Sequence, residues 1–157
     1  MSDPVIVVRP ALLTDSDEVM HLAGLMYEAM GVDASGAAWR SAGTDALASR
    51  LGHDAAVYVA EHPGAPGRLV ACGGGTISVR LPGPHNPHPA SGYIQWISTD
   101  PEWRSRGLAR RIMVALLDWY DRKGVRSVEL HATATGEPLY CSLGFVEGPY
   151  RALRRRT

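Results

Sequence analysis

The sequence predicts a mixed α/β domain with an antiparallel first half. Short β-branched and aromatic segments alternate with stretches of helical spacing. They follow the order strand, helix, helix, three strands, helix, strand, helix, strand. Such an order is typical of a mixed α/β domain, and the three successive strands supply its antiparallel part. The length of 157 residues corresponds to one domain, because domains commonly run to about 150 residues.

The N-terminal third begins with a strand and two helices. Residues 5–10 form a β-branched run closed by proline, which predicts a first strand. Thr14 or Asp15 can cap the helix that follows, and Gly31 ends it. A second, weaker helical pattern covers residues 44–51.

Three strands are expected next. Residues 55–62 and 68–81 predict two strands joined by a proline- and glycine-rich turn. Three consecutive glycines at 73–75 weaken the second strand and indicate a bulge or a close approach of other backbone. The proline-rich stretch 82–92 predicts a loop. Residues 93–99 predict a strand that is covered on both faces.

The C-terminal half alternates helices and strands. An apolar stripe of helical spacing and a terminal glycine predict one long helix over 104–123. We then expect a strand at 125–132, a short helix at 137–144 and a final strand at 145–155.

Composition limits the function classes. Sixteen basic and sixteen acidic residues cancel, which argues against a nucleic-acid-binding protein, because such proteins need a broad positive field. No apolar run is long enough for a membrane span. Cys72 and Cys141 are interpreted as small buried side chains in a reducing compartment, so we expect a cytoplasmic protein. His85 and His88 lack a third ligand nearby, and no metal site is expected.

The stretch DPEWRSRGLARR at 100–111 contains four arginines and one glycine. A strand ends before Pro101, and a helix is expected to begin at about Arg104. Its first amides have no partners within the helix, and the helix dipole attracts anions there. Gly107 would let a phosphate approach the backbone. By itself this stretch fits a phosphate cradle, an ordinary charged helix start or a basic patch.

Two motifs choose between these interpretations. R-x-x-G-x-A at 104–109 and L-Y-x-x-x-G-F at 139–145 resemble the two signatures of the GCN5-related N-acetyltransferase (GNAT) superfamily. The resemblance covers about residues 92–148. It implies a mixed central sheet split into a V-shaped cofactor slot and flanked by about four helices. It also implies that residues 1–157 are one acyl-CoA N-acyltransferase-like domain that uses acetyl-CoA.

The resemblance also implies the cofactor contacts. Main-chain amides of about 106–111 would bind the CoA diphosphate, and the strand at 96–99 would pair with the pantetheine arm. Thr133 stands where many members carry an asparagine that contacts the pantetheine. The expected cofactor-binding residues are Trp96, Ile97, Ser98, Thr99, Arg104, Ser105, Arg106, Gly107, Leu108, Ala109, Arg110, Arg111 and Thr133.

The implied reaction is acetyl transfer from acetyl-CoA to a primary amine. Tyr140 corresponds to the family's general acid, which protonates the leaving thiolate. The general base stays open among Glu28, His131, Asp100 and a water molecule. The alternative is a non-catalytic acyl-CoA-binding or sensing module. The acceptor is a small-molecule or protein amine, selected by the N-terminal helices and the loop at 82–91. Dimers are frequent in the similar family, so a homodimer is a further expectation.

Overall fold

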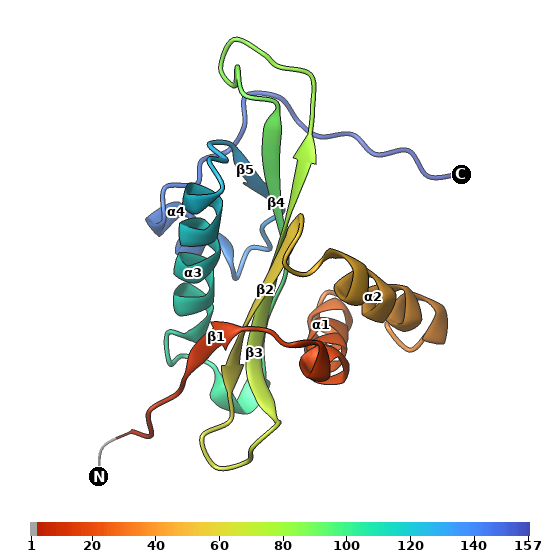
Figure 1. The fold of residues 1–157 in the computed structure, drawn as a ribbon, viewed down its shortest axis with the longest axis vertical. Coiled ribbons are helices and arrows are strands. Elements are labelled where there is room, and N and C mark those ends of the chain that lie inside the picture. Colours follow the sequence, from red (N-terminus) through yellow and green to blue (C-terminus); the bar gives the residue numbers. More distant parts are fainter. Residues whose placement is uncertain (1–2) are drawn as a thin grey trace.

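The computed structural model describes residues 3–157 and contains one five-stranded mixed sheet. The strands lie side by side in chain order (Figure 1). Neighbouring strands are antiparallel from β1 to β4, and β5 is parallel to β4. The predicted mixed sheet is confirmed. The strands are β1 (Val8–Pro10), β2 (Ala55–Glu61), β3 (Leu69–Val79), β4 (Ala90–Thr99) and β5 (Val128–Leu130).

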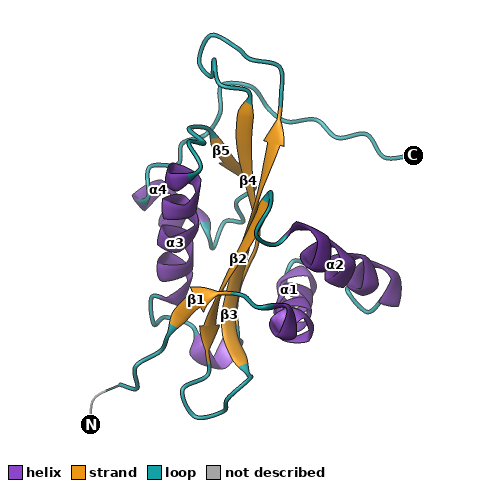
Figure 2. Ribbon diagram, viewed as in Figure 1, coloured by secondary structure: helices purple, strands orange, loops and turns teal. Residues whose placement is uncertain are grey.

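Helices cover both faces of the sheet (Figure 2). The helices α1 and α2 lie on one face, and α3 and α4 lie on the other. Their bounds are α1 (Ser16–Ala29), α2 (Ala37–Arg50), α3 (Leu108–Arg122) and α4 (Glu137–Ser142), with single turns of 3-10 helix at η1 (Leu13–Asp15) and η2 (Pro101–Trp103). Within residues 3–157, none of the helices combines the length and the apolar composition needed to cross a membrane.

The glycines of β3 let α3 pack directly on the sheet. A β-carbon on Gly75 or on Gly92 of β4 would collide with the ring of Tyr120. The Tyr120 hydroxyl donates to the carbonyls of Thr76 and Tyr93, each over 3.0 Å. The expected close approach is therefore confirmed, although a side chain makes it rather than backbone. The expected bulge lies opposite Gly73 on the neighbouring strand.

The sheet opens between β4 and β5. These strands pair only where Gly92, Tyr93 and Ile94 face Val128, Glu129 and Leu130. The second half of β4, from Gln95 to Thr99, continues without a β5 partner and stays paired to β3. A register shift accompanies the opening, because Cys72 pairs with Ser98 whereas Gly74 pairs with Gln95. Two β4 residues thus face one residue of β3, which defines a β-bulge.

Several expected boundaries are wrong. The second helix starts at Ala37 rather than residue 44, because its small residues give a weak apolar pattern. The strand after the loop starts at Ala90, so the expected loop 82–92 is the shorter tip of a hairpin closed by the amide of Arg80 on the carbonyl of Pro89. The first strand, expected at 5–10, and the strand expected at 125–132 are only three residues each.

The expected final strand at 145–155 does not form. Gly148 and Pro149 interrupt the segment, and four of the seven residues after Tyr150 are arginines. Such a segment has no apolar face to bury, and proline removes a ladder hydrogen bond. The C-terminal segment instead passes the sheet end that carries the β3–β4 hairpin and finishes on the α2 side (Figure 1).

Candidate functional site

The turn between β4 and α3 is built by left-handed backbone. Asp100 caps η2, since its carboxylate accepts from the amide of Glu102 over 2.9 Å. Ser105 and Gly107 then take positive φ angles of 61° and 74°. Left-handed residues beside ordinary ones turn successive amides to one side, as in anion-binding concavities. The helix begins at Leu108, not at Arg104 as expected, because this turn occupies the intervening residues.

The first turn of α3 presents backbone amides. The amide of Arg111 donates to the carbonyl of Gly107 over 3.1 Å and closes the first helical turn. The amides of Leu108, Ala109 and Arg110 precede that bond and have no acceptor within an α-helix. Of the main-chain amides expected at 106–111, the amide of Arg111 is therefore already used within the helix. Space beyond Gly107 is open, because a β-carbon there would meet no atom within 4 Å.

The arginine side chains in this region have separate contacts. The Arg106 guanidinium carbon lies 4.7 Å from the centre of the Trp103 ring, a cation–π contact. Arg110 donates to the hydroxyl of Ser142 over 2.8 Å and so joins α3 to α4. Arg111 donates to the carbonyl of Ile6 over 2.8 Å and holds the segment before β1. Arg104 and Ser105 are exposed beside the turn.

The opened half of β4 directs its side chains into the protein. Trp96 has a positive φ of 62° at the bulge, and its ring packs with the α1 and α2 cluster. Ile97 packs on the opposite face with α3. Ser98 is buried and donates to the carbonyl of Leu22 over 2.7 Å, while Thr99 pairs with Ala71. The strand therefore offers backbone rather than side chains toward the opening beside β5.

The two cysteines differ in their exposure to solvent. Cys72 is buried under the bulge, where its thiol donates to the carbonyl of Trp96 over 3.4 Å. Burial raises the pKa of the Cys72 thiol to about 12, so the reactive thiolate is disfavoured. Cys141 is exposed on α4. Its expected burial is wrong, because this six-residue helix packs on the core through Leu139 and Tyr140.

The structure brings together two expected site residues, Tyr140 and Thr133. A β-carbon built on Gly136 would lie 3.4 Å from both the Thr133 Oγ1 and the Tyr140 Oη. The Thr133 hydroxyl also accepts from the Gly136 amide over 3.2 Å. Tyr140 packs edge-on to Phe145, with ring centres 6.3 Å apart. Burial raises the pKa of Tyr140 above its usual value, which favours the protonated phenol.

The candidate bases have different surroundings. His131 follows β5, and its Nδ1 lies 3.0 Å from the Tyr93 hydroxyl on the neighbouring strand. No sequence motif marks Tyr93, because only strand register places it beside His131. Glu28 is exposed near the end of α1. The Asp100 carboxylate already has two partners, since it caps η2 and its Oδ2 lies 3.6 Å from the Arg68 guanidinium.

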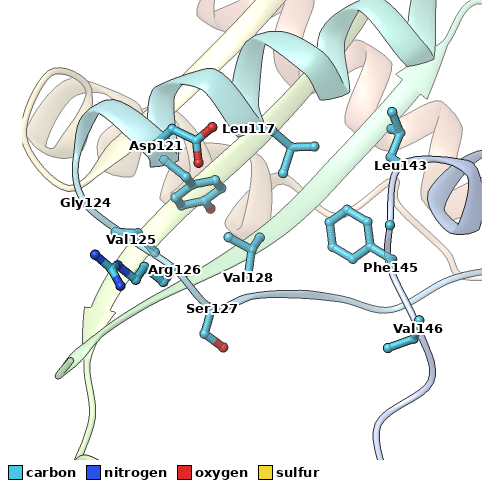
Figure 3. A pocket seen from close by; sticks show the side chains of 12 residues that line it. Leu117, Asp121, Gly124, Val125, Arg126, Ser127, Val128, Leu143, Phe145 and Val146 are labelled. Atoms are coloured by element: carbon cyan, nitrogen blue, oxygen red, sulfur yellow. The ribbon is translucent and has the colours of Figure 1, made fainter. Parts of the chain in front are cut away.

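Two cavities lie away from the α3 turn. One of about 690 Å³ lies at the other end of α3, between that helix, β5 and the segment after α4. In Figure 3, Leu117, Val128 and Phe145 point toward one another at this cavity. A second cavity of about 260 Å³ lies between α2 and the sheet. In the described part of the chain, no three His, Cys, Asp or Glu side chains gather as a metal site requires.

Solved structures share this fold. A GCN5-related N-acetyltransferase from Ralstonia eutropha JMP134 is 24% identical with a TM-score of 0.83, covering 96% of this chain and 99% of that one. A predicted acetyltransferase with acetyl-CoA from Clostridium acetobutylicum is 19% identical with a TM-score of 0.81, covering 96% of each chain. Glucosamine-6-phosphate N-acetyltransferase from Arabidopsis thaliana is 16% identical with a TM-score of 0.75, covering 96% of this chain and 98% of that one.

The sequence itself identifies the family. No curated protein matches it significantly. The sequence model described as "Acetyltransferase (GNAT) domain" matches residues 53–147, more than half of the chain. This stretch includes the β4–α3 turn, the opening between β4 and β5, and α4. The protein therefore belongs to the GCN5-related N-acetyltransferase (GNAT) family of acetyltransferases.

Proposed function

We propose that the protein transfers an acetyl group from acetyl-CoA to a primary amine, by direct attack of the amine on the thioester. The observation that carries this proposal is the left-handed turn at 105–107, which leads into the free first-turn amides of α3 beside the opened sheet. Family membership supplies the reaction class.

The turn fits a diphosphate. Amides of Leu108, Ala109 and Arg110 would donate to its oxygens, and the N-terminal end of the helix dipole favours their negative charge. Gly107 leaves the approach open. Arg104 and Arg106 add positive charge at the rim. Acetyl-CoA supplies the activated acetyl group as a co-substrate.

The opened half of β4 would hold the rest of acetyl-CoA. Its backbone, from Trp96 to Thr99, has no β5 partner on that side. The amides and carbonyls there that neither β3 nor the Cys72 thiol uses would pair with the pantetheine. An amide near Ile97 would donate to the oxyanion that forms when the amine attacks. Thr133 would donate from the other side of the opening.

The amine must lose a proton before it attacks. With a lysine-like pKa of about 10.4, only a few molecules in ten thousand are neutral at pH 7. We assign the acceptor of this proton to His131, because the Tyr93 hydroxyl orients its ring through a 3.0 Å contact. The exposed Glu28 has no such partner among the described residues. Water can carry the proton between amine and ring.

The leaving thiolate needs a proton. Tyr140 would supply it, since burial raises the pKa of the phenol and keeps it protonated at neutral pH. A cysteine nucleophile is not required, and Cys72 is buried with a raised thiol pKa. A cytoplasmic location and a homodimer stay predictions from the sequence.

Calorimetry and a thiol-release assay test the proposal. We expect acetyl-CoA to bind to the purified protein, and a panel of primary amines to increase the release of coenzyme A thiol. Absence of acetyl-CoA binding would contradict the proposal. Binding without amine-dependent thiol release would favour the alternative, a non-catalytic acyl-CoA-binding module of the same fold.

A further inference from the structure

The cavity between α2 and the sheet has one wall made by a single stripe of α2. The stripe contains Trp39, Ala42, Gly43, Ala46, Leu47 and Arg50. These positions follow the spacing i, i+3, i+4, i+7, i+8 and i+11, so they share one face of the helix. The apolar pattern of this stripe is weak, because three of its six members are alanine or glycine.

The small side chains explain why the cavity exists. Protein interiors are normally packed without voids larger than a water molecule. Here Ala42 and Ala46 on α2 face Ala55 and Gly74 on the strands, and these residues are too short to meet across the gap. Gly43 does not widen the gap, because a β-carbon there would collide with the Met20 side chain. A β-carbon on Gly74 would have ordinary contacts, at 3.5 Å from the Gln95 carbonyl and 3.6 Å from Val57. An alanine would thus fit at position 74 without a clash.

Two tryptophans give the cavity rigid aromatic walls. The Trp39 indole donates to the carbonyl of Ala34 over 2.9 Å and meets the Tyr27 ring edge-on at 5.5 Å. Trp96 is held by the β4 bulge and packs among the α1 and α2 residues. Preformed apolar clefts with fixed aromatic walls are typical of small-molecule sites.

The charges of the cavity exclude a polycation. Its lining contains no aspartate or glutamate. Arg50 is the charged residue of the lining, and its guanidinium is paired with Asp54 over 2.9 Å. The charged amines of a polyamine or an aminoglycoside would lose hydration here without gaining a carboxylate partner, and an unpaired charge is strongly disfavoured when it leaves water. An apolar group has no such cost.

The cavity begins where the reaction is proposed to occur. Gln95 and Trp96 line it, and they are the first β4 residues after the strand leaves β5. We propose that this cavity binds the apolar group of the acceptor, so that the substrate is a primary amine bearing an aromatic or branched aliphatic group. This inference rests on the proposed acetyl transfer and adds the substrate class. A volume of about 260 Å³ suits one such group.

The test compares amines with the cavity open and filled. Phenethylamine, ethylamine, spermidine and kanamycin serve as acceptors in the thiol-release assay. We expect phenethylamine to have the highest kcat/KM. In Ala46→Phe the new ring occupies the cavity, and kcat/KM for phenethylamine should fall about 10-fold or more, the effect of losing the burial of one aromatic ring. Ethylamine should react as before.

Matched variants keep the result specific. Ala48→Phe places the same ring on the exposed side of the same helix and should behave like the wild type. Gly74→Ala reduces the cavity from the sheet side and replaces Ala46→Phe if that variant fails to fold. Calorimetric titration of phenethylamine, with and without coenzyme A, reports binding independently of turnover.

The outcomes separate the two proposals. Faster turnover of spermidine or kanamycin than of phenethylamine would overturn the substrate class and leave acetyl transfer intact. Equal phenethylamine binding by wild type and the filled variants would also overturn it. Loss of acetyl-CoA binding would instead contradict acetyl transfer. Even then, phenethylamine binding that is lost in Ala46→Phe supports the cavity assignment, and no binding to the wild type refutes it.

Discussion

Gly107 has a left-handed backbone conformation and lies in the turn that we propose to bind the diphosphate. Gly107→Glu should weaken acetyl-CoA binding by about 100-fold, because a carboxylate would stand where the diphosphate is proposed to lie and would repel it. Calorimetry measures the loss. Gly124→Glu is the control, since Gly124 lies at the other end of α3 with φ of 72° and equally open surroundings. Both variants carry the same left-handed strain, so equal affinities would disprove the assigned turn.

Tyr140 carries a separate prediction, for turnover rather than affinity. Tyr140→Phe removes the proton donor and should lower kcat by about 100-fold, within the usual range for a general acid. Acetyl-CoA affinity should stay unchanged, because the ring still packs on Phe145. Since burial raises the pKa of the phenol, its deprotonation should not reduce kcat between neutral and mildly alkaline pH. Steady-state kinetics with unchanged kcat would remove Tyr140 from the mechanism.

The helix α4 carries Tyr140 but has only six residues, so its position depends on its links. Ser142 accepts from Arg110 of α3 over 2.8 Å and donates to the Leu139 carbonyl over 2.6 Å. Ser142→Ala should increase amide hydrogen exchange in α4 severalfold, because a net hydrogen bond contributes about 1 kcal/mol. We also expect lower kcat at unchanged acetyl-CoA affinity.

A second serine supplies the comparison for this link. Ser49 makes the same kind of local bond, to the Ala46 carbonyl over 3.3 Å, on the exposed surface of α2. Ser49→Ala should leave both exchange in α4 and kcat unchanged. If Ser142→Ala behaves like Ser49→Ala, then the contact with Arg110 does not position α4.

The elements also divide into those that sequence patterns could and could not define. Long periodic segments such as α1 and α3, and β-branched runs such as β2, are found because burial repeats along them. The turn before α3 resembles helix in the sequence because arginines and serine are compatible with helix, whereas the positive φ of Ser105 depends on tertiary context. The cavity beside α2 likewise has no signature in the sequence, because small side chains leave no apolar pattern.

The contact between His131 and Tyr93 is a second feature that sequence patterns do not reveal. The two residues are 38 positions apart, and only parallel pairing of β4 with β5 sets them side by side. The position of His131 at a strand end does not indicate which residue it contacts. A continuous motif such as 104–109 can be found in the sequence alone, whereas a contact made through sheet register cannot.

An ion-pair network links three elements of the N-terminal half of the molecule. Arg9 of β1 donates to Asp15 over 2.7 Å and to Glu61 of β2 over 2.9 Å. Asp15 is only 5% exposed, and it also accepts from the Leu12 amide over 2.7 Å. The network joins the edge of the sheet to the start of α1, which in turn packs against β4 through the Ser98 contact.

The contribution of Asp15 to the free energy of unfolding should decrease at acid pH. The Arg9 guanidinium holds the pKa of the Asp15 carboxyl below its usual value. Above the unfolded pKa of about 3.9, Asp15 is ionised in both states and its contribution is complete. As the pH falls below that value, the unfolded chain binds the proton first, so the free energy of unfolding decreases until folded Asp15 is protonated as well.

Removing the carboxylate should show how much this network contributes. Asp15→Asn should lower the free energy of unfolding at pH 7 by about 2–3 kcal/mol, because the partly buried Arg9 guanidinium loses the more buried of its two carboxylate partners and keeps only Glu61. It should also flatten the decrease below pH 4. Asp54→Asn removes an arginine-paired carboxylate as well, but that pair is exposed, so its effect should stay within about 1 kcal/mol. Urea unfolding at several pH values measures the free energy of unfolding of both variants. Equal decreases in the two variants would mean that burial does not strengthen the pairing of Asp15.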